Sequence, residues 1–211
     1  MVIDPSSLSR RAIYKLLIGS VVPRPIAWVS TVSEAGGNNL APFSFFTVVS
    51  TQPPMMSITL ERRLGTGGSK DTLQNIQATG VFVINVVSVP LAEAMEESSC
   101  EHPPDVNEFV SAGVTAAPSC VVAAPRVGEA LISMECVLET VITPGSDHVV
   151  IGRMVRYHVY DDLLHDGKID IERLQPLGRL AGRYTRITEI FDVRPARGSA
   201  SKARRAVARS G

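Results

Sequence analysis

The chain has 211 residues, 45% of them hydrophobic and 20% charged, which is typical of a globular protein with a sizeable core. Its formal net charge is zero, and this balance argues against a nucleic-acid-binding surface over the whole protein. It contains no run of about 18 apolar residues, so no membrane span is predicted.

The chain ends and the cysteines bear on where the protein works. Asp4 and the lack of a continuous apolar stretch near it argue against a signal peptide. Cys100, Cys120 and Cys136 are odd in number and widely spaced, as expected for reduced cysteines that pack as small hydrophobic residues. We therefore predict a soluble cytoplasmic protein. Residues 196–211 are rich in Arg and Lys and lack acids, which predicts a flexible basic tail.

The first predicted element is a helix over residues 9–18. Ser9 can accept a backbone N–H as its N-cap, and Gly19 is expected to end it. Pro23 and Pro25 then keep the backbone extended around Arg24, because a proline disfavours the α region for the residue before it. From these residues alone, Arg24 is interpreted as a surface arginine between two turns.

Strands dominate the stretch that follows. Residues 26–32, 55–61 and 81–87 are rich in β-branched and other apolar residues and predict strands, the last of them buried. The chain returns from a turn through residues 40–50, where Pro42 marks a bulge or a sheet edge because proline cannot donate to a ladder. Residues 71–79 predict a helix, capped by Ser69 or Asp71 and closed by Gly80.

The second half predicts short helices at residues 90–99 and 107–112 and two long strands at 131–142 and 148–160, joined by a turn. A last strand is expected at 187–193. Each long strand alternates, so its core face should carry one set of apolar side chains: Ile132, Met134, Cys136, Leu138 and Ile142 in one, Val149, Ile151, Val155, Tyr157 and Val159 in the other. Ser133, Glu135 and Glu139 should face solvent. Many strands with short helices favour a mainly β fold, an antiparallel barrel, as a single domain over residues 1–195.

A glycine-rich loop precedes Lys70 and superficially resembles a phosphate-binding P-loop. That motif needs Gly before the Lys and Ser or Thr after it, whereas Ser69 and Asp71 flank Lys70, so we reject it. Lys70, Thr72 and the N–H groups of the following helical turn remain candidates for holding a phosphate. The alternative is a plain helix cap with a solvated lysine.

Other chemical motifs are missing. The four histidines, His102, His148, His158 and His165, lack metal-binding spacing, so no metal site is predicted. No G-x-S-x-G motif is present, and no G-x-G-x-x-G follows a strand, so neither a serine hydrolase nor a Rossmann domain is indicated.

Three segments occur in an order that resembles a known family: PRPIAWVST from Pro23, NLAPFSFF from Asn39, and KDT from Lys70. Together they resemble the flavoredoxin branch of the flavin reductase-like proteins, over roughly residues 16–195. The resemblance implies an FMN-binding split barrel that forms a homodimer with the flavin near the subunit interface. It also implies NADH or NADPH as electron donor and a monooxygenase as recipient of reduced flavin.

The resemblance also implies site residues. Arg62, Lys70 and Thr72 are candidates for the FMN phosphate, with Asp71 beside them. The candidates for the ring and ribityl chain are Ser30, Thr31, Asn39, Ala41, Ser44 and Phe45. Arg24 and Pro42, in the same segments, are further candidates for cofactor binding. The stretch GSDHVVIG resembles the G-D-H of flavin reductases with Ser146 inserted, which makes His148 the catalytic candidate beside the nicotinamide. PLGRLAGRYTRI, residues 176–187, resembles the family's R-L-G-G-x-x-Y stretch, with Ala181 in place of glycine.

Two other functions remain open. One is a flavoredoxin-like protein that keeps its FMN and passes electrons to a protein or a small substrate. The other is a non-enzymatic binding module that uses the basic tail.

Overall fold

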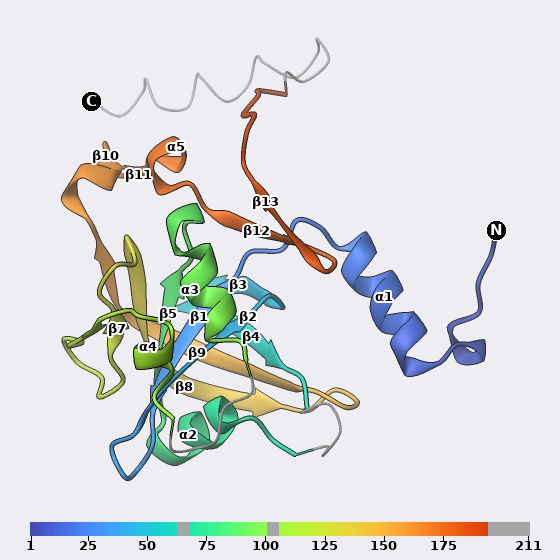
Figure 1. Cartoon of the computed structure of the whole chain (residues 1–211), viewed down its shortest axis with the longest axis horizontal. Helices are drawn as coiled ribbons and strands as arrows, with labels where there is room; N and C mark the ends of the chain where they lie inside the picture. Colours follow the sequence, from blue (N-terminus) through green and yellow to red (C-terminus); the bar gives the residue numbers. More distant parts are fainter. Residues whose placement is uncertain (63–67, 101–105, 194–211) are drawn as a thin grey trace, which may run out of the picture.

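The computed structural model describes residues 1–62, 68–100 and 106–193. Its centre is a seven-stranded antiparallel sheet in the order β2-β1-β5-β8-β9-β4-β3 (Figure 1). The strands are β1 (Ala27–Val32), β2 (Asn38–Phe43), β3 (Phe46–Thr51), β4 (Pro54–Leu60), β5 (Val81–Val86), β8 (Ile132–Ile142) and β9 (His148–Val159). The predicted mainly β, antiparallel fold is confirmed.

The sheet curls around a core that joins its two ends. Phe43 of β2 and Ile58 of β4 belong to one buried cluster, although these strands lie at opposite sides of the strand order. Helix α2 (Asp71–Thr79) packs Leu73 and Ile76 into the same cluster. Gly152 of β9 lies so close to the Phe82 ring that an added Cβ would fall 2.3 Å from its Cζ atom.

A second core lies on the outer face of β1. Trp28 is fully buried there against Met95 and Phe109, and its indole N–H donates to the Ser98 hydroxyl at 2.8 Å. Met95 belongs to α3 (Ala92–Glu97), which follows the 3-10 turn η2 (Val89–Leu91), and Phe109 belongs to α4 (Glu108–Ser111). Because these helices cover the outer face, β1 is buried on both sides.

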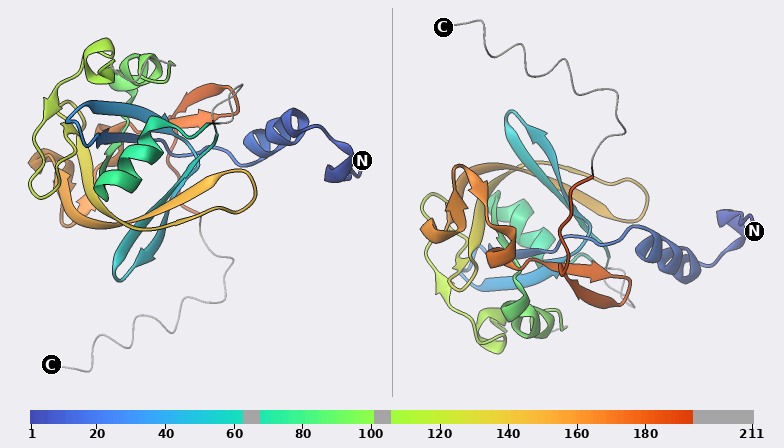
Figure 2. Two further views of the ribbon diagram at one scale, coloured as in Figure 1. Left: turned by 90° about the horizontal axis from the view of Figure 1, so that it is seen from below. Right: turned by 90° about the horizontal axis from the view of Figure 1, so that it is seen from above.

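The first helix, α1 (Arg10–Ser20), follows the 3-10 turn η1 (Pro5–Ser7) and projects from the body of the molecule (Figure 2). The Ser9 hydroxyl accepts the Ala12 N–H at 3.3 Å, which confirms the predicted N-cap. The predicted end at Gly19 is wrong, since the helix continues to Ser20. Gly19 has no positive φ to break the helix. No residue of α1 is buried.

Three other predictions about local structure need correction. The N-cap of α2 is Lys70 without a side-chain cap bond, so neither Ser69 nor Asp71 caps it, whereas Gly80 closes it with φ 72° as predicted. No strand forms at residues 187–193. The last hairpin is instead β12 (Leu177–Leu180) and β13 (Arg183–Arg186), whose turn occurs at Ala181 and Gly182.

The predicted faces of the long strands are only partly right. Ser133 and Glu135 of β8 are buried, because the Ser133 hydroxyl donates to Asn85 and residues 120–122 cover Glu135. A register shift between Leu138 and Thr140 then changes the phase of β8. Val141, rather than the exposed Ile142, therefore packs against the core. In β9 the fully buried residue is Val150, not its neighbours Val149 and Ile151.

The remaining elements are short: the strand pairs β6 (Ala116–Ala117) with β7 (Arg126–Val127) and β10 (Leu164–His165) with β11 (Lys168–Ile169), the turn η3 (Asp161–Leu163) and α5 (Ile171–Leu174). β2 is an edge strand, as Pro42 indicated. No helix in the described ranges is long and apolar enough to span a membrane. The predicted basic tail and most of the glycine-rich loop lie outside the described residues, and the domain boundary stays a prediction.

Candidate functional site

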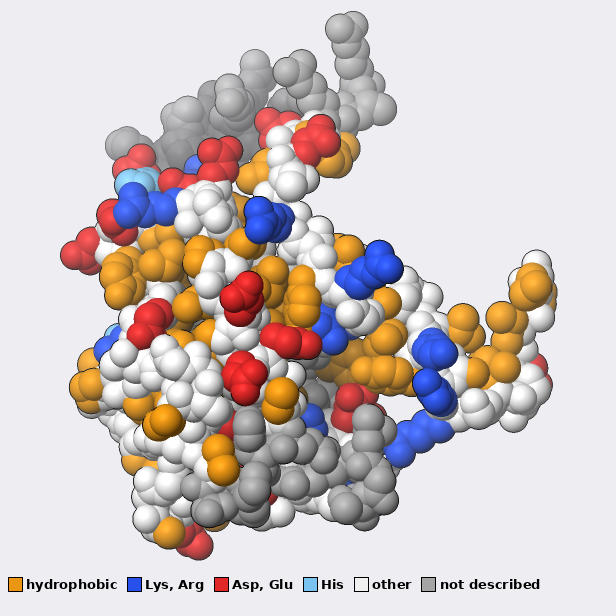
Figure 3. Space-filling model, in the orientation of Figure 1, with side chains coloured by type: hydrophobic (Ala, Val, Ile, Leu, Met, Phe, Trp, Pro, Cys, Tyr) orange, Lys and Arg blue, Asp and Glu red, His pale blue; other side chains and the backbone are white. Residues whose placement is uncertain are grey.

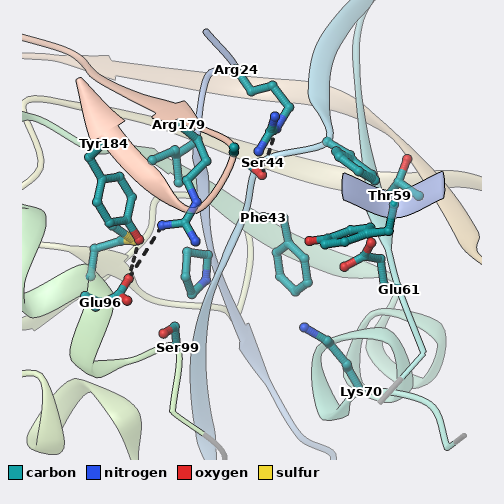
Figure 4. Close-up of a pocket in the computed structure, with 16 residues that line it drawn as sticks. Arg24, Phe43, Ser44, Thr59, Glu61, Lys70, Glu96, Ser99, Arg179 and Tyr184 are labelled. Atoms are coloured by element: carbon teal, nitrogen blue, oxygen red, sulfur yellow. Dashed lines mark hydrogen bonds and ion pairs between the residues drawn. The ribbon is translucent and has the colours of Figure 1, made fainter. Parts of the chain in front are cut away.

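A pocket of about 180 Å³ opens where α1, the end of β2, β4, the start of α2, α3 and the β12–β13 hairpin approach one another (Figure 4). Five of the residues predicted for cofactor binding line it: Arg24, Pro42, Ser44, Phe45 and Lys70. Basic side chains also gather over α1, at the right of the space-filling view (Figure 3). The pocket is therefore the place where the sequence prediction and the tertiary structure agree best.

Arg179, on β12, supplies a cation that the sequence did not assign to the site. Its guanidinium carbon lies 4.3 Å from the centroid of the Tyr184 ring. Its Nη1 atom is buried without a hydrogen-bond partner in the described part of the chain, and lies 3.9 Å from Glu96 Oε2. A buried cationic donor of this kind, at the wall of a pocket, favours an anionic or carbonyl-bearing ligand.

Lys70 approaches the pocket from the N-terminus of α2. Its Nζ lies 5.1 Å from the centroid of the Phe43 ring, in a cation–π arrangement. The backbone N–H groups of the first turn of α2 add partial positive charge at the same end. The lysine and the helix terminus thus favour negative charge together.

Arg24 has a different role from the surface arginine that the prolines suggested. It is only 5% exposed. Its Nη1 donates to the carbonyl oxygens of Ile18 and Val21, at 2.7 and 3.0 Å, and its Nε donates to the Ser44 hydroxyl at 3.2 Å. Arg24 therefore ties the end of α1 to the segment that follows β2, and so shapes the pocket wall.

The acid–base groups of the pocket are shifted toward their neutral forms. Burial, and then the charge of Asp147, raise the pKa of Glu61, although Lys70 and two arginines oppose this. Burial also raises the pKa of Tyr14. Burial and a hydrogen bond to Glu96 raise the pKa of Tyr184 to about 12. Both phenols are therefore neutral at ordinary pH.

Three predicted residues, Thr31, Asn39 and Thr72, form an interior network instead of the pocket lining, and Ser30 is buried separately. Asn39 Oδ1 accepts hydrogen bonds from the hydroxyls of Thr31 and Thr72, at 3.3 and 2.9 Å. Asn39 Nδ2 donates to Glu108 at 2.8 Å. Ser30, fully buried, donates to the carbonyl of Pro125. The network fixes the first turn of α2 against β2, and in this way it positions Lys70.

The other predicted residues lie apart. Ala41 packs against the main core, Arg62 is exposed, and Asp71 is the first residue of α2. His148 begins β9 and its Nδ1 lies 3.1 Å from the Thr143 hydroxyl, outside the pocket lining. The turn before it is nonetheless near the pocket, because the charge of Asp147 acts on Glu61.

Sequence reasoning missed Tyr14, Glu61, Glu96, Arg179 and Tyr184. A signal was present for the last two, because both lie in the segment 176–187 that resembles a family motif. Glu61 and Tyr14 had no signal, since only the fold brings α1 and the end of β4 together.

Comparisons with known proteins agree with this picture. The family model of the flavin reductase-like domain matches residues 18–188. The chain is similar to nitrilotriacetate monooxygenase component B from Bacillus cereus, with a TM-score of 0.88 and 38% identity over 92% of this chain and 98% of that one. It is also similar to the 2-nitrobenzoate 2-nitroreductase of Pseudomonas fluorescens, with a TM-score of 0.84 and 30% identity over 94% of this chain and 100% of that one.

A third structure bears on the fold alone. It is a putative flavin reductase with a split barrel domain from Shewanella frigidimarina. The match covers 93% of this chain and 100% of that one. The TM-score is 0.80 at 21% identity. The split-barrel architecture that the resemblance implied is thereby confirmed.

Proposed function

The chain belongs to the family of flavin reductase-like domains, and from this premise we propose that it is an NAD(P)H-dependent flavin reductase that binds FMN and supplies reduced flavin to a monooxygenase. The observation that carries the proposal is the pocket with the buried Nη1 of Arg179, which has no hydrogen-bond partner among the described residues. The likeness to a monooxygenase component supports the proposed partner.

The residues of the pocket suit a flavin mononucleotide. Its phosphate is a dianion and calls for charge-assisted donors, which Lys70 and the N-terminus of α2 supply, with Arg62 close by in sequence. The segment from Pro42 to Phe45 supplies an aromatic and apolar wall for a planar ring, with the Ser44 hydroxyl at its centre. Arg179 supplies a cationic donor from the opposite hairpin, where the Tyr184 hydroxyl donates to Glu96.

FMN, when bound, supplies the hydride chemistry. The protein binds and orients it. Arg24 donates a hydrogen bond to Ser44 and so fixes the segment that contains Ser44 and Phe45. The hydrogen bond between Thr72 and Asn39 fixes the start of α2, next to Lys70. Burial raises the pKa of Glu61, which disfavours the charged form of this carboxyl group beside a phosphate. We place His148 at the rim, where it would help to dock the nicotinamide.

The test is an absorption spectrum of the purified protein with FMN, before and after anaerobic NADH or NADPH. We expect one FMN per chain and bleaching of the flavin band by at least one nicotinamide donor. At FMN one hundred times its Kd, binding to the native state alone should stabilise the fold by about 2.7 kcal/mol. Apo protein whose melting temperature does not respond to saturating FMN would refute the proposal. A parallel FAD titration tests the choice of flavin.

The likeness to a nitroreductase favours a second candidate. In that case the protein keeps its FMN and passes electrons to a small substrate. Flavin that remains bound through purification, with rapid turnover of a nitroaromatic compound but slow reduction of free FMN, would favour this function over the first.

We further propose a cytoplasmic homodimer. The cysteines Cys100, Cys120 and Cys136 are all free thiols, as expected in a reducing compartment. On α1, Leu16 and Leu17 are 47% and 55% exposed, and Val48 on the edge strand β3 is 57% exposed. Both α1 and the β3–β4 hairpin project from the body, which suits contact with a second copy (Figure 2).

A further inference from the structure

Three side chains that suit a metal ion meet on a part of the fold that the pocket does not use. A sulfur of Cys120, a carboxylate oxygen of Glu135 and a ring nitrogen of His158 all lie within 4.8 Å of one another. Cys120 belongs to the loop before β7, whereas Glu135 and His158 stand on β8 and β9. None of the three lines the candidate flavin pocket.

Glu135 is the fixed centre of this cluster. It is fully buried, and its Oε1 lies 2.5 Å from His158 Nε2. Oε1 also accepts the Cys120 N–H at 2.6 Å, and Oε2 accepts the N–H groups of Val121 and Val122 at 2.8 and 3.1 Å. The loop is thus wrapped around the carboxylate by its own backbone, and this brings the Cys120 side chain to His158.

We propose that Cys120, Glu135 and His158 form a zinc site that fastens this loop to β8 and β9. Thiolate, imidazole and carboxylate are the ligands that Zn²⁺ takes in proteins, and three of them with one water complete a tetrahedron. The thiolate favours Zn²⁺ over the hard ions Mg²⁺ and Ca²⁺, which prefer oxygen ligands only.

The hydrogen-bond inventory is consistent with such an ion. A carboxylate has about four acceptor sites, and here backbone N–H groups and His158 use them. Of these four contacts to Glu135, only the one with His158 involves another side chain. Zn²⁺ would take the place of the proton between Nε2 and Oε1. The neutral imidazole would then carry its proton on Nδ1, and the Cys120 thiol would release its proton to solvent on binding. The two atoms must separate slightly, since each ligand lies about 2.0–2.2 Å from a zinc ion.

The cluster is open to solvent, so an ion can reach it, and its ligands are far apart in sequence, so a search for short motifs does not find it. Cys120 is exposed and the His158 side chain is 22% exposed, so an ion can enter from solvent. The ligands are 15 and 23 residues apart, because a loop and two antiparallel strands supply them. The prediction of no metal site rested on short-range spacing, which does not sample such a cluster.

The experiment is a Zn²⁺ titration of the chelator-treated full chain, by calorimetry and native mass spectrometry. Cys120→Ser is compared with Cys100→Ser, which changes the other exposed cysteine. We expect one Zn²⁺ per chain in the wild type and in Cys100→Ser, and affinity at least about tenfold weaker in Cys120→Ser. Co²⁺ should give a thiolate charge-transfer band in the first two proteins and none in the third.

A second variant, His158→Gln, should also lose at least about tenfold in affinity, with its fold checked by circular dichroism. FMN binding should be unchanged in Cys120→Ser, so failure of the zinc site and failure of the flavin function are separable. Absence of Zn²⁺ binding by the wild type would overturn the proposal. Equal binding by Cys120→Ser and the wild type would overturn it as well, since the ion would then be held by other surface groups.

Discussion

Lys70 combines two sources of positive charge, its own ammonium group and the N-terminus of α2. Lys70→Ala removes one charge-assisted contact, so we expect FMN binding to weaken by roughly 1.5–3 kcal/mol. Riboflavin lacks the phosphate and should bind the two proteins alike. Because Lys70 also lies over the Phe43 ring, the stability of the apo variant is measured as a control. An equal loss for both flavins, in fluorescence titrations, would assign Lys70 to packing instead.

A substitution of His148 distinguishes a flavin reductase from an electron-transfer flavoprotein. If its ring docks the nicotinamide, His148→Ala should slow anaerobic flavin reduction several-fold to about tenfold, since one neutral hydrogen bond contributes about 0.5–1.5 kcal/mol. FMN affinity should change little, because His148 lies outside the pocket lining. Stopped-flow reduction measures this rate. Unchanged kinetics in a well-folded variant would remove His148 from the site.

The raised pKa of Glu61 makes the free energy of unfolding depend on pH, and the sign of this dependence follows from the direction of the shift. Burial raises its pKa in the folded protein, so the neutral form is favoured there. The stability that this contributes is fully present below the unfolded pKa, about 4.3, and is lost as pH rises through the folded pKa. Glu61→Gln cannot ionise. Its stability relative to the wild type should therefore increase from about pH 4 upward and then level off.

Urea unfolding of both proteins across this pH range measures the difference. A difference that does not vary with pH would show that Glu61 is as well solvated in the folded state as in the unfolded one. The charged groups that act on Glu61 are Asp147, Lys70, Arg10 and Arg24.

In β9, Gly152 lies close to the ring of Phe82 from β5, the strand on the other side of β8. An added Cβ at Gly152 would lie 2.3 Å from Cζ and 2.7 Å from Cε1 of Phe82, which is itself fully buried. Gly152→Ala should therefore destabilise the fold by about 1–3 kcal/mol through overpacking.

Gly19→Ala is the matched control, because nothing lies within 4 Å of the added Cβ and the site is helical. It should be neutral or stabilising by up to about 1 kcal/mol. Chemical denaturation of both variants measures the contrast. Similar effects from the two substitutions would mean that Phe82 moves aside without cost.

For the molecule as a whole, the exposed apolar surface of α1 predicts a dimer. Static light scattering should give twice the chain mass. Replacing both Leu16 and Leu17 by Glu places charge on the exposed face of α1 and should reduce the mass to that of one chain. FMN affinity should fall with dissociation if the flavin lies near the subunit interface. A wild type of single-chain mass at all concentrations would contradict the dimer.

The sequence by itself determined the local structure wherever one residue type has one strong backbone preference. Ser9 caps α1, Gly80 closes α2, and Pro42 marks an edge strand. Apolar runs located the strands of the main sheet within a few residues. The ordered motifs around Pro23, Asn39 and Lys70 then indicated the family, and part of the pocket with it.

Only the tertiary structure decided which faces are buried and which remote residues meet. Ser133 and Glu135 lie on the polar face of β8 and are nevertheless buried. Asn85 of β5 accepts the hydrogen bond of the Ser133 hydroxyl, and the loop at residues 120–122 donates to Glu135. Arg179 and Glu61 line one pocket because β12 bridges to Arg24 through Arg179, which brings the last hairpin to the pocket that the residue after β4 also lines. Periodicity reports one strand at a time, whereas burial and site geometry depend on what packs against it, and that information is absent from any local stretch of sequence.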